Sequence, residues 1–310
     1  MSGFSARRPL GKTGLQVSPL GIGGGGGIQA DDLLYAFERG INYFFYSSDL
    51  HHFSYSQSAP ALRNLCMRGS TTRDQVVLAT VSYLDDPDKL LSVLFDQFSD
   101  LGIDYIDVFH WGWITNKCDV FALAQAAGAL KDNGVLARAY RNFEAMMFEA
   151  KEVNEELLKR GVVRNIGMSF HSRQAALRAL PDIDVMMIRY NITLTDVERI
   201  VFSHLSRNKA CDPGIVAFNT AHNKLQSFTN PPSHYPKDLY IPSVPDLYRF
   251  ALSNPWVDVV LTGVSTRQQI DQALDAMEQG PLGQEDYEFL REYGSIFADY
   301  AAFNSTGMPT

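Results

Sequence analysis

The chain has 310 residues, of which 45% are hydrophobic and 20% are charged, so it can bury a core and general disorder is excluded. Its formal net charge of −8 disfavours nucleic-acid binding, because an acidic surface repels a phosphate backbone. Three widely spaced cysteines, Cys66, Cys118 and Cys211, predict neither a disulfide framework nor a metal site, and they suit a reducing compartment. The start lacks a signal-peptide pattern and no apolar run approaches about 18 residues, so we expect a cytoplasmic protein without a membrane span.

Eight short apolar runs alternate with amphipathic segments along the chain. Near-continuous apolarity is typical of parallel strands that are buried on both faces. The expected strands are Val17–Gly23, Ile41–Ser47, Val76–Val81, Tyr105–Gly112, Val163–Ser169, Val185–Asn191, Gly214–Thr220 and Val257–Gly263. The expected helices include Asp31–Arg39, Pro87–Leu101, Asp119–Lys131 and Thr266–Gln279. Eight such units predict an α/β fold, a closed (β/α)8 TIM barrel forming one domain over residues 1–310, with a doubly wound open sheet as the alternative.

Two regions depart from this simple repeat. Asn133–Arg160 is long, charged and rich in Ala and Glu, and we expect it to extend the helix before the fifth strand. Thr229–Pro245 contains five prolines and is expected to form a long loop after the seventh strand, on the face where barrels carry their sites. For each of these two regions, a purely structural role at the surface and a functional role are equally good interpretations.

Five consecutive glycines, Gly23–Gly27, follow the first expected strand. They form part of a GxGxxG pattern, but the second strand ends in Phe45-Tyr46-Ser47 without the acidic residue that a dinucleotide-binding motif requires. We expect these glycines to allow close backbone approach to a ligand at the barrel mouth, or to form an irregular loop.

Several stretches together resemble the aldo-keto reductase superfamily. They are RRPLGKTGLQVSPLGIGG near the start, GINYFFYSS at the second strand, DYIDVFHWGW at the fourth, VVRNIGMSF at the fifth, RYN at the sixth and LSNPWVDVVLTGVSTRQQIDQAL at the eighth. The resemblance spans roughly residues 7–295 and implies a barrel that begins with a short β-hairpin. It also implies NADPH or NADH held at the C-terminal mouth and hydride transfer to a carbonyl, with a Tyr proton donor assisted by Lys, His and Asp. Such assistance is needed because a phenol with an ordinary pKa near 10 is a poor acid.

This sequence departs from the family at all four catalytic positions. The resemblance places Phe45 where the family has Asp, Leu50 near the Tyr, Val81 at the Lys and Gly112 at the His. Phe and Val carry no titratable proton, so the usual reductase mechanism is not encoded.

The cofactor positions that the resemblance implies are also altered. Gly263, Val264, Gln269 and Ala273 replace the usual Lys, Ser, Arg and Asn after the eighth strand, while Phe170 and Met187 replace an Asn and a Gln. The remaining candidates for binding NADP or NAD are Ser169, Phe218, Ser265, Thr266 and Arg267.

Strand alternation identifies side chains that could act instead. The candidate proton carriers are Tyr55, Tyr83, His110 and His171. The candidate substrate contacts are Phe45, Trp113, Arg189, Asn191 and His222. Arg189 carries most weight, because a charge inside a barrel is costly unless it pairs with a carboxylate or an anionic ligand.

Each candidate has a structural alternative. His110 suits a hydrogen-bonded core histidine, and Arg189 suits an internal salt bridge. Trp111 and Trp113 have outward parity and suit packing between barrel and helices, although Trp113 lies near the loop and is also a substrate candidate. Asp49, His51 and His52 resemble half a metal site, but adjacent histidines on an extended segment point apart, so we expect no metal.

The leading hypothesis is a repurposed enzyme on this fold. It would perform acid–base chemistry, or an atypical NAD(P)-linked redox step, on a small and potentially anionic organic molecule. The alternative is a pseudoenzyme that binds a ligand or serves as the subunit of a partner protein.

Overall fold

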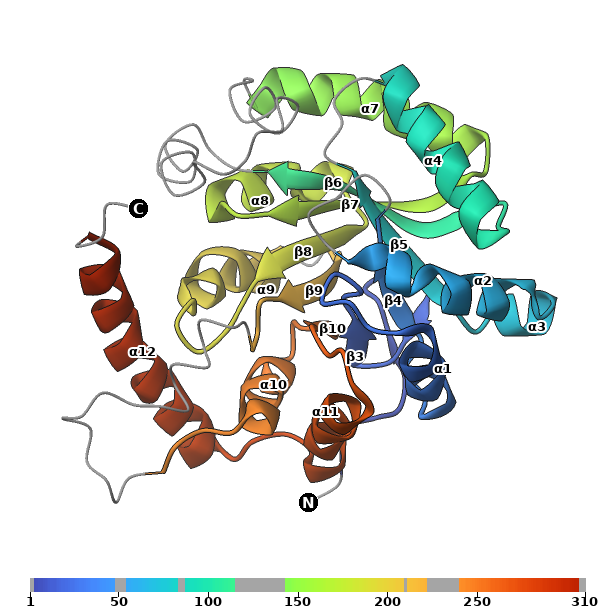
Figure 1. Ribbon diagram of the computed structural model, residues 1–310. Helices are drawn as coiled ribbons and strands as arrows, with labels where there is room; N and C mark the ends of the chain where they lie inside the picture. The colour runs from blue at the N-terminus through green and yellow to red at the C-terminus, as the bar shows by residue number, and fades with distance from the viewer. Residues whose placement is uncertain are drawn as a thin grey trace.

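Eight parallel strands close into a barrel in the order β10-β3-β4-β5-β6-β7-β8-β9, surrounded by helices, which confirms the predicted TIM barrel (Figure 1). This computed structural model describes residues 3–47, 54–82, 87–114, 143–208, 211–221 and 240–306. The barrel strands are β3 Leu20–Ile22, β4 Tyr43–Tyr46, β5 Val77–Ser82, β6 Ile106–Ile114, β7 Val163–Phe170, β8 Val185–Arg189, β9 Gly214–Phe218 and β10 Val259–Thr262. All eight expected strands are present, with ends shifted by up to three residues.

A short hairpin covers the N-terminal end of this barrel. Strands β1 (Arg8–Pro9) and β2 (Gln16–Val17) pair antiparallel, as the family resemblance implies. Leu10 between them is fully buried against Gly214, the first residue of β9. The carboxylate of Asp258, just before β10, accepts hydrogen bonds from the backbone N–H groups of Gly11 and Ile215. With this end covered, the C-terminal ends of the strands are left as the face for a site.

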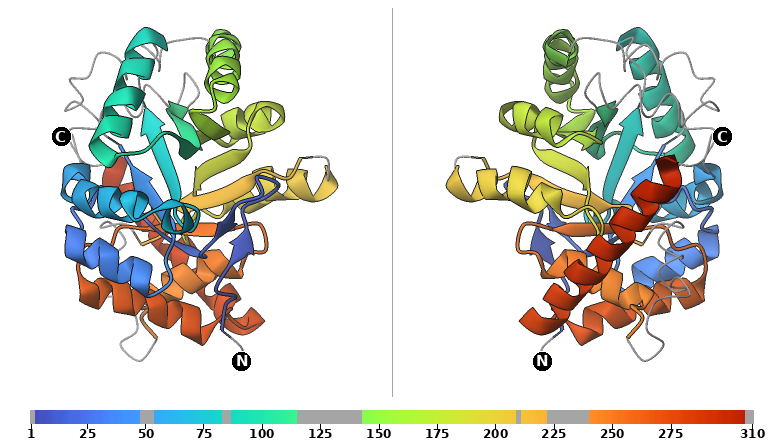
Figure 2. Two further views of the ribbon diagram at one scale, coloured as in Figure 1. Left: turned by 90° about the vertical axis from the view of Figure 1, so that its right-hand side faces the viewer. Right: turned by 90° about the vertical axis from the view of Figure 1, so that its left-hand side faces the viewer.

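The helices pack outside the barrel (Figure 2). They are α1 Ala30–Glu38, α2 Ala59–Met67, α3 Ser70–Arg73, α4 Pro87–Leu101, α7 Phe143–Lys159, α8 Arg173–Ala179, α9 Ser203–Arg207, α10 Val244–Ser253, α11 Arg267–Gln279 and α12 Gln284–Thr306. Short 3₁₀ turns span Tyr55–Gln57 and Leu180–Asp182, and a π-helical turn spans Glu198–Phe202. Among the described residues, no helix combines the length and apolarity needed to cross a membrane.

The two irregular regions are described only in part. The helical part of Asn133–Arg160 is α7, which begins at Phe143, while residues 133–142 and the expected helix Asp119–Lys131 lie outside the described residues. Of the expected loop Thr229–Pro245, residues 229–239 lie outside the described residues, and Pro245 lies in the first turn of α10 rather than in a loop. Proline suits that turn, where its missing N–H has no helical acceptor to lose.

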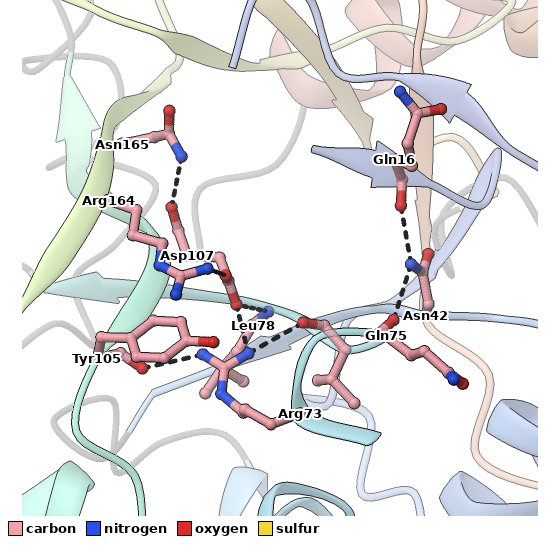
Figure 3. A network of polar contacts seen from close by, with 10 residues as sticks. Gln16, Asn42, Arg73, Gln75, Leu78, Tyr105, Asp107, Arg164 and Asn165 are labelled. Atoms are coloured by element: carbon pink, nitrogen blue, oxygen red, sulfur yellow. Dashed lines mark hydrogen bonds and ion pairs between the residues drawn. The ribbon is translucent and has the colours of Figure 1, made fainter. Parts of the chain in front are cut away.

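A buried polar network ties β5, β6 and β7 together near their N-terminal ends (Figure 3). Asp107 accepts hydrogen bonds of 2.9 Å from the Arg73 guanidinium and from the backbone N–H of Leu78. The ring of Tyr105 lies between two guanidinium groups, 3.9 Å from that of Arg73 and 3.6 Å from that of Arg164. This network lies at the end of the barrel opposite the expected site, and its buried charges pair internally.

Candidate functional site

Three predicted site residues meet at the C-terminal ends of β7, β8 and β9. Arg189 is the last residue of β8 and pairs in register with Phe218, the last residue of β9. Ser169 on β7 pairs with Met187 on β8, so His171 follows two residues later at the level of Arg189. The Arg189 guanidinium carbon lies 5.9 Å from the Phe218 ring centroid, and the His171 ring centroid lies 5.7 Å from it in an edge-to-face arrangement. One phenyl ring therefore brings an imidazole and a guanidinium together.

Two arginines, Arg189 and Arg173, act on the buried imidazole of His171. Burial and, to a smaller extent, the charges of Arg189 and Arg173 together lower the pKa of His171 to about 3. Arg173 is itself held by Asp196, with an N–O distance of 2.9 Å, and it donates a hydrogen bond to the backbone carbonyl of His171. At neutral pH the imidazole of His171 is thus uncharged.

His110 lies deeper, on the floor of the barrel. It pairs in register with Gly167, four residues before His171, which corresponds to about 13 Å along the strand. Its Nδ1 lies 3.1 Å from the carbonyl oxygen of Thr80, which only accepts, so Nδ1 carries the proton and Nε2 is the acceptor. That Nε2 has no hydrogen-bond partner among the described residues, and burial lowers the pKa of His110 to about 4.

An aromatic row connects His110 to the glycine-rich loop. The Phe45 ring lies 5.9 Å from the His110 ring and 6.2 Å from the Tyr55 ring. Tyr55 is buried in its 3₁₀ turn and contacts Gly24, whose φ of 57° places it in the left-handed region. A Cβ at Gly24 would lie 2.9 Å from Cδ1 of Tyr55, so the close backbone approach expected of these glycines is made here to the chain itself.

The side chain of Asn191 forms hydrogen bonds mainly with backbone groups. Its Nδ2 donates to the carbonyl of Asn219, and its Oδ1 accepts from the N–H groups of Thr193 and Leu194 and from the Thr193 hydroxyl. These bonds connect the segment after β8 to the segment after β9. Asn191 therefore fixes the relative position of Arg189 and Phe218, and its predicted contact with substrate stays a prediction.

The residues after β10 are engaged within the chain. The backbone N–H and the hydroxyl of Ser265 both donate to Oε1 of Gln269, and the Thr266 side chain caps α11 by accepting from the Gln269 N–H. The Arg267 guanidinium bonds to Asp32 of α1 and lies 5.2 Å from the Tyr35 ring centroid. Ser169 is buried on β7, and Phe218 has Arg189 and His171 against its ring. Most side chains of this set thus have partners within the chain, and their binding of NADP or NAD stays a prediction.

The remaining predicted residues are placed as follows. Tyr83 and His222, like Asp49, His51 and His52, lie outside the described residues, and so does the side chain of Trp113. Trp111 is buried and its Nε1 donates to Asn154 of α7, as expected for packing between barrel and helix. Within the described segments no group of three or more potential metal-binding side chains occurs.

Sequence reasoning missed a cluster behind Arg189. The Tyr190 hydroxyl donates to Glu198 over 2.6 Å and lies 2.7 Å from the Tyr287 hydroxyl of α12, while Asn254 donates to it. Arg291 of α12 also bonds to Glu198. The only sequence signal was the outward parity of Tyr190, which gives no partner. The cluster attaches α12 to the residue next to Arg189.

Comparison with known proteins supports the fold. No protein-family model matches the chain, and no curated protein matches it either. Among solved structures it resembles the aldo-keto reductase AKR11C1 from Bacillus halodurans. The apo form is 19% identical with a TM-score of 0.65, and the holo form is 19% identical with a TM-score of 0.66. Both alignments cover 93% of this chain and 95% of that one.

A second similar structure is the thermostable aldo-keto reductase Tm1743, in complex with the inhibitor epalrestat. It is 17% identical with a TM-score of 0.64, and the alignment covers 93% of this chain and 99% of that one. The chain therefore has the fold of the aldo-keto reductases.

Proposed function

We propose that this chain binds a small organic anion at the C-terminal ends of β7, β8 and β9 and performs acid–base chemistry on it. The observation that carries the proposal is the contact of Arg189 and His171 with one ring, that of Phe218. A guanidinium binds a carboxylate through two parallel hydrogen bonds, which fixes both its position and its orientation.

His171 supplies the proton acceptor in this proposal. The imidazole, which is neutral at pH 7, exchanges a proton with a carbon or hydroxyl group next to the bound carboxylate. Dehydration, isomerisation and cyclisation need such proton transfers and no hydride. These reaction classes fit a chain that has Phe45 and Val81 where the resemblance implies catalytic Asp and Lys.

Calorimetric titration with benzoate and benzenesulfonate tests the binding step. Arg189→Ala is expected to weaken binding at least about tenfold, because it removes charge-assisted hydrogen bonds. Arg207→Ala is the matched control, since Arg207 is exposed and its guanidinium bonds to Ser203 of its own helix. Unchanged affinity in Arg189→Ala would overturn the site assignment.

A second measurement addresses catalysis. A panel of 2-oxo and 2-hydroxy acids is incubated with the protein in D₂O and followed by proton NMR for deuterium incorporation or dehydration. Turnover that is lost in His171→Gln supports the enzyme. Binding without turnover by any acid favours the alternative, a ligand-binding or partner-subunit protein on the same fold.

An NAD(P)-linked redox activity is the competing proposal. It is favoured by the fold, since one similar structure is described as a holo form. The internal pairing of Ser265 and Arg267 and the contact of Arg189 with Phe218 count against it. Titration with NADPH and NADH, followed by quenching of tryptophan fluorescence, decides: binding below millimolar concentration supports the redox reading, and its absence removes it.

A further inference from the structure

The hydroxyl of Thr220 is buried at the C-terminal end of the barrel without a partner in the described part of the chain. Thr220 follows Phe218, the last residue of β9, by two positions, and it is 2% exposed. Its Oγ1 forms no hydrogen bond with any residue that the structure describes. Such a hydroxyl has given up its contacts with water and gained none in return, which costs free energy on folding. A bound molecule would supply the hydrogen-bond partner that these residues do not.

Thr262 shows the structural use of the same side chain on the neighbouring strand. It is the last residue of β10, which pairs in parallel with β9, and it is 1% exposed. Its Oγ1 donates to the carbonyl oxygen of Gly21 on β3 over 2.8 Å. Two buried threonines thus lie at the C-terminal ends of adjacent strands, and the hydroxyl of Thr262 joins β10 to β3 whereas that of Thr220 joins no described residues.

The backbone before Thr220 is held in place by the chain. Asn219 has a φ of 57°, in the left-handed region that non-glycine residues adopt only at a cost. The carbonyl oxygen of Asn219 accepts a hydrogen bond of 2.9 Å from Nδ2 of Asn191. This bond attaches the turn that carries Thr220 to the segment after β8, which begins next to Arg189.

We propose that the Thr220 hydroxyl binds a hydroxyl group on the carbon next to the ligand's carboxylate, so that the substrate class is the 2-hydroxy acids. This inference rests on the proposed function, in which the carboxylate pairs with Arg189. Register places Phe218 beside Arg189, and Thr220 is two residues further along, so we expect one small acid to reach both side chains. A threonine hydroxyl donates one hydrogen bond and accepts others, so it matches a ligand hydroxyl in both roles.

Calorimetry with mandelate and phenylacetate tests this contact, because the two acids differ by the hydroxyl on the carbon next to the carboxylate. The wild-type protein is expected to bind one enantiomer of mandelate about three- to tenfold more tightly than phenylacetate, the usual worth of one hydrogen bond. Thr220→Val replaces the hydroxyl by a methyl group, and it should remove this preference while leaving the affinity for phenylacetate within about twofold. Thr220→Ser keeps the hydroxyl and should keep the preference.

Urea unfolding separates a binding role from a structural one. Thr220→Val removes a buried hydroxyl that has no partner among the described residues, so its unfolding midpoint should equal or exceed that of wild type. Thr262→Val is the matched control, since it breaks the bond to Gly21 and should lower the midpoint while leaving the preference for mandelate unchanged. A midpoint of Thr220→Val that falls as far as that of Thr262→Val would show that the Thr220 hydroxyl serves the fold, and it would overturn the inference.

The binding results separate the two levels of the proposal. Equal affinities of the wild-type protein for mandelate and phenylacetate, or a preference for mandelate that persists in Thr220→Val, overturn this inference and leave the proposed function standing. No binding of either acid or of benzoate to the wild-type protein at millimolar concentration overturns the proposed function and this inference with it.

Discussion

The ring of His110 on β6 fills the space that Gly167 leaves on β7. A Cβ at Gly167 would lie 2.6 Å from Cδ2 and 2.8 Å from Nε2 of His110, and 3.0 Å from the carbonyl oxygen of Val185. The same relationship recurs between Gly21 and Tyr43, where a Cβ would lie 2.8 Å from Cδ1 of the tyrosine. Glycines inside two strands thus allow large polar rings to occupy the barrel interior.

Gly167→Ala is expected to destabilise the protein by about 1–3 kcal/mol, because the added methyl overpacks a site bounded partly by backbone. Urea unfolding measures the change. Gly263→Ala is the control, since a Cβ there would meet no atom within 4 Å. In the background of His110→Ala, the same Gly167→Ala change should cost less. Equal costs in the two backgrounds would show that the ring is not the obstacle.

The stability of the N-terminal end of the barrel should depend on pH through Asp258. Burial raises its pKa to about 6, despite hydrogen bonds from Ile215 and Gly11 that oppose this shift. Because the unfolded pKa is about 3.9, the folded state binds the extra proton between these values, so the free energy of unfolding falls as the pH rises from about 4 to 6. Asp258→Asn should remove on the order of 2 kcal/mol of this fall. Urea unfolding at several pH values tests this, and identical pH profiles for variant and wild type would contradict it.

The barrel could be predicted because its strands are buried on both faces, which makes them continuous apolar runs. Their ends were less certain, since apolar or polar character does not mark where hydrogen-bond pairing stops. The run Val185–Asn191 continues past the last paired residue, Arg189, because Asn191 turns the chain with its side chain.

The side chains of the candidate site could be predicted in part, but their partners could not. Strand alternation made His171 and Arg189 candidates at the barrel mouth, and the resemblance made Phe218 a cofactor candidate. The structure places all three against one another at the Phe218 ring. The partners of Tyr190 could not be predicted, because Tyr287 lies 97 positions away and no periodic pattern connects them. The contact of His110 with Gly167 depends on the register between β6 and β7, which cannot be read from a single sequence.

Tyr287→Phe is expected to loosen α12 without displacing it. The change removes hydrogen bonds to Glu198 and Tyr190, whereas the ring keeps its stacking on Phe250, with centroids 4.6 Å apart. We expect a loss of about 1 kcal/mol in urea unfolding, the usual worth of such bonds, and faster amide exchange in α12. Tyr287→Ala also removes the stacked ring and should cost about 3 kcal/mol or more. A larger loss in the Phe variant than in the Ala variant would contradict this account.

Breaking the buried pair of Asp107 and Arg73 should lower the free energy of unfolding far more than removing the outer partner, Arg164. Asp107→Ala leaves the buried Arg73 guanidinium without its carboxylate, and we expect a loss of about 3–5 kcal/mol. Arg164→Ala should cost less than about 1 kcal/mol, because that side chain is 49% exposed and its nitrogen lies 3.7 Å from Asp107. Replacing both buried charges, as in Arg73→Met with Asp107→Leu, should recover much of the loss, since no charge is then left unpaired. Urea unfolding of the three variants against wild type decides, and a loss for Arg164→Ala equal to that for Asp107→Ala would show that the exposed arginine carries the network.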